Sequence, residues 1–110
     1  MRWGSLPMKR PEECETMADV RAGIDRIDAA LVALLVERAG YIDRAAGIKA
    51  VLDLPARIED RVEEVVANVR SRAGEGGLDP DLAEALWRRL IDWSIAREEE
   101  RLGPDAQRLR

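Results

Sequence analysis

The stretch MADVRAGIDRIDAALVALLVERAGYIDRAAGIKAVL, residues 17–52, decides the fold. Its apolar residues recur every three or four positions, which is the period of an amphipathic helix: Val20, Ile24, Ile27, Leu31, Leu34, Leu35, Ile42, Ala45 and Ile48. Thr16 offers an N-cap oxygen, and Asp19 follows three residues later in a capping-box arrangement. No proline interrupts the pattern until Pro55. The sequence therefore predicts a helix from about 17 to about 52, roughly 50 Å long.

Two shorter helices are predicted downstream. Valines and isoleucines between 58 and 69 indicate a helix over about 57–73, which we expect the Gly-Glu-Gly-Gly run at 74–77 to end. Asp79-Pro80-Asp81 is typical of a helix start, with an N-cap acid followed by proline at the first helical position. The third helix is expected to end before Gly103-Pro104. The predicted fold class is all-α, with three helices and a very long first one.

The length of the first helix predicts a dimer. A compact domain of this size has a radius of gyration of only about 13 Å. Two shorter helices cannot cover an amphipathic helix of roughly 50 Å, so we expect an obligate, intertwined homodimer in which the apolar stripe packs on a second copy. Glycines at 23, 40 and 47 would permit close approach of helices. The expected layout is a tail over 1–15, a helical domain over 16–102 and a tail over 103–110.

Composition excludes several classes of function. The 110-residue chain has a net charge of −4, which argues against general nucleic-acid binding. It has no histidine, so His-based catalysis and His-ligated metals are excluded, and its single cysteine, Cys14, fits a reducing cytoplasm. No apolar run approaches the roughly 20 residues of a membrane span. The opening MRWGSLPMKRP lacks the apolar core of a secretory signal, and Met8 is an alternative natural start.

Lys49 is the most unusual charged residue of the chain. The sequence carries sixteen arginines but only two lysines, and Lys49 lies beside Ile48 near the end of the first predicted helix. Arg38 precedes it by eleven residues, which places both within about 20° of one helix face and about 16 Å apart. Unpaired buried cations are costly. We therefore expect an anionic partner, either a carboxylate of this protein or a ligand.

Other polar residues lie on or beside the apolar stripes: Arg21, Arg61, Ser94 and Glu98. Ser94 and Glu98 are four residues apart and share a helix face. Arg21 lies about 100° around the helix from Arg38, so a dimer could bring Arg21 to the partner's site. Two interpretations stay open at this point. One is a charged, buried site; the other is a plain dimerisation helix with interhelical salt bridges, a serine bonded to its preceding turn and a solvated acidic run at 98–100.

Several groups of residues keep a fixed spacing: Val20-Arg21-x-x-Ile24-Asp25-x-Ile27-Asp28, Leu34-Leu35-x-Glu37-Arg38, Lys49, Pro55, Arg61, and the third helix from Leu78-Asp79 through Trp87 to Ser94 and Glu98. This spacing resembles the all-helical chorismate mutase family over about residues 9–102. The opening Lys9-x-Pro11-Glu12-Glu13-Cys14 and the stretch Trp93-x-Ile95-Ala96 resemble the isochorismate pyruvate lyases, a branch of the same family.

The resemblance implies a shared active site. Family members are intertwined three-helix homodimers with two equivalent sites, each completed by an arginine from the partner. Arg21 resembles that crossing arginine by position. Arg38 and Arg61 resemble the in-chain arginines near the substrate's carboxylates.

The resemblance also assigns roles around the breaking bond. Lys49 resembles the lysine that contacts a carboxylate and the ether oxygen, and Ser94 resembles the serine near the ring carboxylate. Glu98 stands where bacterial mutases commonly carry glutamine, the second donor to the ether oxygen. An ionised carboxylate only accepts hydrogen bonds, so Glu98 must be protonated to take that role. Ile58 and Val62 stand where mutases often carry acids that hold the ring hydroxyl, which leaves substrate preference open.

The residue inventory fits this chemistry. Chorismate is a dianion that fixed guanidinium and ammonium groups suit, and its pericyclic rearrangement needs no nucleophile, metal or cofactor. It needs a compact substrate conformation and positive charge near the ether oxygen. We therefore predict a chorismate mutase of aromatic amino-acid biosynthesis, with Lys49, Arg38 and Glu98 as its catalytic residues.

Three alternatives remain. They are an isochorismate pyruvate lyase releasing salicylate and pyruvate, a mutase of an amino-substituted chorismate, and a catalytically silent dimeric scaffold. Ser94 favours the mutase, whereas the N-terminal stretch and Val62 favour the lyase.

Overall fold

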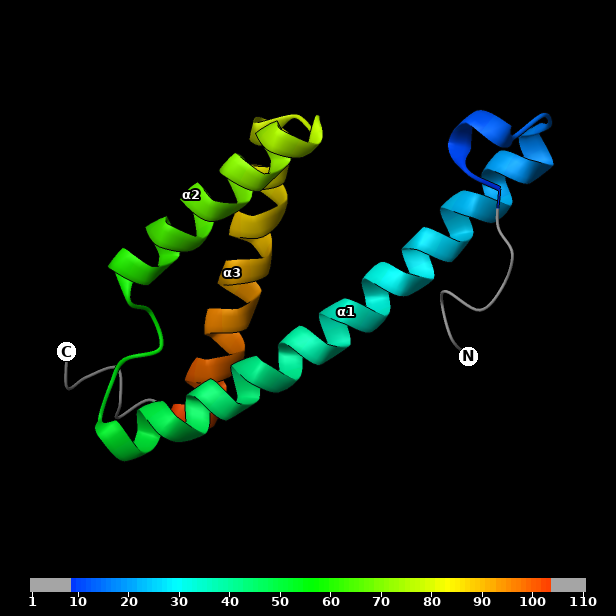
Figure 1. Cartoon of the computed structure of the whole chain (residues 1–110). Coiled ribbons are helices and arrows are strands. Elements are labelled where there is room, and N and C mark those ends of the chain that lie inside the picture. Colours follow the sequence, from blue (N-terminus) through cyan, green and yellow to red (C-terminus); the bar gives the residue numbers. More distant parts are fainter. Residues whose placement is uncertain (1–8, 104–110) are drawn as a thin grey trace. The chain divides into compact units, whose positions relative to one another are not determined.

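The computed structural model describes residues 9–103, and these residues form an all-helical chain. A short 3-10 helix, Pro11–Glu13, precedes three α-helices: α1, Met17–Leu52; α2, Glu59–Gly76; and α3, Pro80–Leu102 (Figure 1). No strand occurs among the described residues. The predicted fold class and the predicted extent of the first helix are confirmed. The proposed start at Met8 and most of the predicted C-terminal tail lie outside the described residues.

The first turn of α1 is capped as the sequence predicts, with one difference. The Asp19 backbone N–H donates to Thr16 Oγ1 at 3.1 Å, which satisfies one of the free donors of the helix end. In a reciprocal capping box the acid would accept from the N–H of Thr16. Asp19 Oδ2 instead accepts from the N–H of Glu15 at 3.1 Å and from Lys9 Nζ at 3.0 Å. The acid thus ties the preceding segment to the helix start.

The end of α1 carries a left-handed residue. Asp53 has a φ of 58°, and the N–H of Leu54 donates to the carbonyl of Lys49 at 2.9 Å. This six-residue closure is the Schellman motif, and Pro55 directly after it prevents the helix from resuming. The motif fixes the backbone of Lys49 within the last turn of α1.

The predicted end of the second helix is wrong by three residues. α2 continues through Gly76, and only Gly77 takes the left-handed conformation, with a φ of 83°. The N–H of Leu78 then donates to the carbonyl of Ala73 at 2.8 Å, which closes a second Schellman motif. Glycine weakens a helix but does not break it, so the run ends the helix only where a residue adopts positive φ. At its other end α2 begins at Glu59 with Ile58 as N-cap, two residues later than predicted.

The start and end of α3 are confirmed. Asp79 Oδ1 accepts from the N–H of Asp81 at 2.9 Å, and Pro80 occupies the first helical position. The helix ends at Leu102, and Gly103 follows with a φ of 82°.

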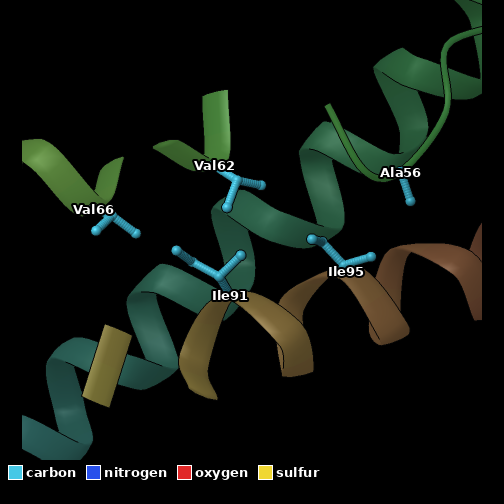
Figure 2. Packing of buried hydrophobic residues seen from close by; sticks show 5 residues of the cluster. All are labelled: Ala56, Val62, Val66, Ile91 and Ile95. Carbon is cyan, nitrogen blue, oxygen red and sulfur yellow. The ribbon is translucent and has the colours of Figure 1, made fainter. Parts of the chain in front are cut away.

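The chain divides into two compact units, residues 1–39 and 40–110. In the second unit α2 and α3 form a helical hairpin around a buried apolar cluster. Val62 and Val66 on α2 point toward Ile91 on α3, while Ala56 of the α1–α2 loop lies near Ile95 (Figure 2). This packing determines which face of α3 is buried. Ser94 and Glu98 lie on that face, because they follow Ile91 by three and seven residues.

In the first unit the apolar stripe of α1 is exposed in the single chain. Val20, Ile24, Ile27 and Leu31 each expose more than a third of their surface. A stripe of this length is costly to leave in water. The homodimer that would bury it stays a prediction.

Candidate active site

Lys49 lies in the last turn of α1 and makes two short hydrogen bonds. Its Nζ donates to Glu98 Oε1 at 2.6 Å and to the carbonyl of Ala56 at 2.7 Å. The Lys49 side chain is 18% exposed and that of Glu98 is 5% exposed. The anionic partner expected for Lys49 is therefore a carboxylate of this protein. An ammonium has three donors, so one of them remains for another acceptor.

Glu98 belongs to the buried face of α3. In the sequence Glu98 begins an acidic run, which is also typical of a solvated surface. In the structure only 4% of its surface is exposed, and Ser94, one turn earlier, is 3% exposed. The Ser94 hydroxyl donates to the carbonyl of Leu90 at 2.8 Å, which is the common arrangement of a serine within a helix. The two polar side chains thus interrupt an otherwise apolar face formed with Ile91 and Ile95.

Arg61 is not part of this buried cluster. It lies in the first turns of α2 with 65% of its side chain exposed, and its Nη1 donates to Glu64 Oε1 at 2.6 Å. An exposed pair of this kind contributes little to stability, about 1 kcal/mol at most. The guanidinium is therefore free to exchange Glu64 for another anion at small cost.

Arg21 and Arg38 belong to the first unit. Arg21 is exposed and Arg38 is half-buried. Their roles at a shared site, and that of Arg61, stay predictions.

The two positions that depart from the mutase pattern carry no acid. Val62 is 6% exposed and packs in the apolar cluster of the hairpin. Ile58 is the N-cap of α2, and its carbonyl accepts from the N–H groups of Arg61 and Val62 at 3.0 and 3.1 Å. Neither side chain can hydrogen-bond a hydroxyl.

The structure adds two features that the sequence did not indicate. The carbonyl of Ala56 accepts a hydrogen bond from Lys49. A pattern of side chains in the sequence does not predict which backbone carbonyl will bind a lysine. Asp43 of α1 binds two arginines of α3: Arg97 Nε lies 2.6 Å and Arg101 Nε 2.9 Å from its Oδ1. A spacing of 97 and 101, four residues apart on one helix face, is the only sequence signal for this second contact.

Within residues 9–103 there is no group of three or more cysteine, aspartate or glutamate side chains placed to hold a metal ion. None of the helices described there is long and apolar enough to cross a membrane.

Comparison with known proteins defines the class. The family described as chorismate mutase type II matches residues 20–99. The chain therefore belongs to the chorismate mutase type II family, as its spacing had indicated.

Individual relatives carry different names. The chain is 38% identical over 95 residues to an isochorismate pyruvate lyase of Pseudomonas aeruginosa, which covers 83% of this chain and 89% of that protein. It is 26% identical over 88 residues to a chorismate mutase of Methanocaldococcus jannaschii, covering 80% of this chain and 89% of that protein. A T-protein of Enterobacter agglomerans is 30% identical over 82 residues, which is 74% of this chain but 22% of that protein. The family is thus shared, while the named activities differ.

Proposed function

We propose that the chain is a chorismate mutase that rearranges chorismate to prephenate without a cofactor. The observation that carries the proposal is the buried pair of Lys49 and Glu98, 2.6 Å apart. Burying an ion pair gains little stability over apolar packing, because desolvation offsets the attraction. Because the pair adds little to stability, we assign it a role in function.

The geometry of Lys49 suits a developing negative charge. Two of its three donors are held by Glu98 and the Ala56 carbonyl, which fixes the ammonium before a substrate arrives. Fixed charge stabilises a transition state best when it needs no reorganisation. We propose that the remaining donor of Lys49 serves the ether oxygen of the breaking bond. Glu98, when protonated, would supply a second donor. Ser94 would serve the ring carboxylate by turning its one donor away from the Leu90 carbonyl.

The arginines complete the proposal. A dianionic substrate calls for at least two further cations. We assign this role to Arg38 and Arg61 of one chain and to Arg21 of a partner chain. The exposed position of Arg61 and its exchangeable pair with Glu64 are compatible with binding an external carboxylate.

A second candidate is an isochorismate pyruvate lyase. Two observations favour it: the relative with that name is 38% identical over most of both chains, and Val62 is packed in the apolar core where mutases often carry an acid. The same cations would serve either reaction, since both break the same kind of ether bond.

One experiment separates the candidates. Purified protein is given chorismate and, separately, isochorismate, and both loss of substrate and release of pyruvate are followed. Loss of chorismate without pyruvate indicates the mutase, whereas pyruvate and salicylate from isochorismate indicate the lyase. Lys49→Ala should abolish the activity, while Lys9→Ala, a change at the only other lysine of the chain, should not. No turnover of either substrate or of an amino analogue would contradict the proposal and favour a silent scaffold.

A further inference from the structure

A second polar contact joins α1 to α3 near the Lys49–Glu98 pair. Arg97 forms a fork on Asp43, with Nε 2.6 Å from Oδ1 and Nη2 2.9 Å from Oδ2. Arg101 adds its Nε at 2.9 Å from Oδ1. The Arg97 guanidinium also lies 5.3 Å from the centre of the Trp93 ring, within the range of a cation–π contact. Asp43 is therefore held by two arginines, one of which is itself oriented by an aromatic ring.

The two contacts are closely linked along both helices. Arg97 and Glu98 are consecutive in α3, and Asp43 precedes Lys49 by six residues, about 9 Å along α1. Ala46 lies midway between Asp43 and Lys49 and is 1% exposed, so a small side chain occupies the space between the two polar contacts. A single contact allows one helix to rotate about it. Two contacts about 9 Å apart restrict both the rotation and the translation of one helix against the other.

Apolar packing contributes little to this alignment. The apolar cluster of the unit draws on α2, α3 and Ala56 and contains no residue of α1. Ala46 is the one buried residue that α1 contributes. The position of Lys49 relative to α3 thus depends strongly on hydrogen-bonded ion pairs between charged side chains of α1 and α3.

We infer that Asp43 is a positioning residue: through Arg97 and Arg101 it sets the register in which Lys49 of α1 meets Glu98 of α3. The structural part stands on the contacts above, and only its consequence for catalysis rests on the proposed function. Asp43 need not touch a substrate. Its removal should leave the helices intact and shift the Lys49 ammonium away from Glu98.

The chain offers a direct readout, because it contains only two lysines. Protein labelled with 13C at lysine gives one ε-carbon signal from Lys49 and one from Lys9, and Lys9→Arg assigns them. The test variant is Asp43→Asn, which keeps one acceptor oxygen but loses the charge and the second acceptor. The matched control is Glu63→Gln, because Glu63 is held by Arg88 in a similar fork, at 3.1 and 3.3 Å, between α2 and α3. That control breaks an equivalent fork without touching α1.

In Asp43→Asn we expect the Lys49 signal to move toward the position of exposed lysine, while in Glu63→Gln it stays in place. An unchanged Lys49 signal in Asp43→Asn, or an equal shift in Glu63→Gln, would overturn the inference. If Asp43→Asn does not fold, Arg101→Gln replaces it. That variant removes one of the two cations on Asp43 and should cause a smaller shift in the same direction; no shift there overturns the inference as well.

The kinetic arm depends on the proposed function. Misplacing a catalytic group by about 1 Å can cost up to roughly a hundredfold in rate. We expect Asp43→Asn to lower kcat by roughly tenfold to a hundredfold with a much smaller change in KM, and Glu63→Gln to change neither. A larger effect on KM than on kcat would contradict a positioning role. Failure of the wild-type protein to turn over any substrate contradicts the proposed function alone, since the lysine signals still report on the register.

Discussion

The ammonium of Lys49 lies 2.6 Å from Oε1 of Glu98, and the two residues are 49 positions apart in the chain. The pair joins the last turn of α1 to the buried face of α3. The carbonyl of Ala56, in the loop between α1 and α2, accepts a second hydrogen bond from Lys49. In this arrangement the carboxylate accepts a hydrogen bond from Lys49. The proposed catalytic role requires that it also donate one to the substrate, which only its protonated form can do.

The first prediction concerns the hydrogen-bonding role of Glu98. If position 98 must donate a hydrogen bond to the substrate, an amide suits that role better than an ionised carboxylate, which only accepts. Glu98→Gln supplies a permanent donor and keeps an acceptor oxygen for Lys49, so it should preserve or raise kcat/KM at neutral pH. The measurement is kcat/KM of both proteins at neutral pH, with folding checked by circular dichroism. A large loss of kcat/KM in a folded Glu98→Gln protein would contradict the donor role.

The second prediction concerns sites shared between chains. Arg21→Ala and Lys49→Ala subunits, each inactive alone, should recover activity when mixed. If Arg21 reaches the partner's site, each mixed dimer holds one site with both defects and one intact site. Recovery should approach about a quarter of wild-type activity at equal mixing, because half of the dimers are mixed and half of their sites are intact. Demonstrated subunit exchange without recovery would place both residues in one chain's site, or Arg21 outside it.

The third prediction is that association and folding are coupled. The exposed stripe of α1, which includes Leu31 at 52% exposure, should be buried against a second copy. Sedimentation should give about twice the chain mass, and dilution should lower the unfolding midpoint. Leu31→Glu should weaken the dimer. Val36→Glu is the control, because Val36 is 68% exposed but lies about 140° around the helix from Leu31. A folded, active monomer would contradict the prediction.

Much of the fold was predictable because it depends on local signals. The period of apolar residues set the bounds of α1, and Thr16 and Asp79-Pro80 marked helix starts through hydrogen bonds made within a few residues. The end of α2 was not predictable from composition alone. Three of the four residues 74–77 are glycines, which weaken a helix without breaking it, and the helix ends only where Gly77 takes a positive φ.

The candidate site was predictable only in part. The apolar neighbours of Lys49 in the sequence predicted an anionic partner but did not identify it. The partner depends on how α1 packs against α3, and local sequence patterns do not determine that packing. No sequence pattern marks Asp43, because its partners Arg97 and Arg101 are more than fifty positions away. Long-range pairs of long side chains leave no periodic trace in a sequence.

The fourth prediction concerns stability in acid. Hydrogen bonding by Arg97, with the charge of Arg101 adding to it, holds the pKa of the Asp43 carboxyl below its ordinary value. As the pH falls, the unfolded chain therefore takes up this proton before the folded one does. The stabilisation by Asp43 is complete above the ordinary aspartate pKa and is lost as the pH drops through the lowered one. In urea unfolding, the stability difference between wild type and Asp43→Asn should shrink over that acidic range. A constant difference would mean that the pair does not titrate as described.

The last prediction compares two glycines at the end of α2. Gly77 has a φ of 83°, whereas Gly74 lies within the helix. At neither position would an added Cβ come within 4 Å of a described atom beyond the neighbouring residues and the helix's own backbone. Gly77→Ala should therefore destabilise through backbone strain alone, by about 1–2 kcal/mol.

Gly74→Ala should instead stabilise by about 0.5–1 kcal/mol, because alanine loses less backbone entropy in a helix. The measurement is urea unfolding of both variants and wild type at one protein concentration, since a dimer's stability depends on concentration. The opposite signs test where α2 ends. If both substitutions destabilise equally, the helix ends before Gly74, and the left-handed conformation is not confined to Gly77.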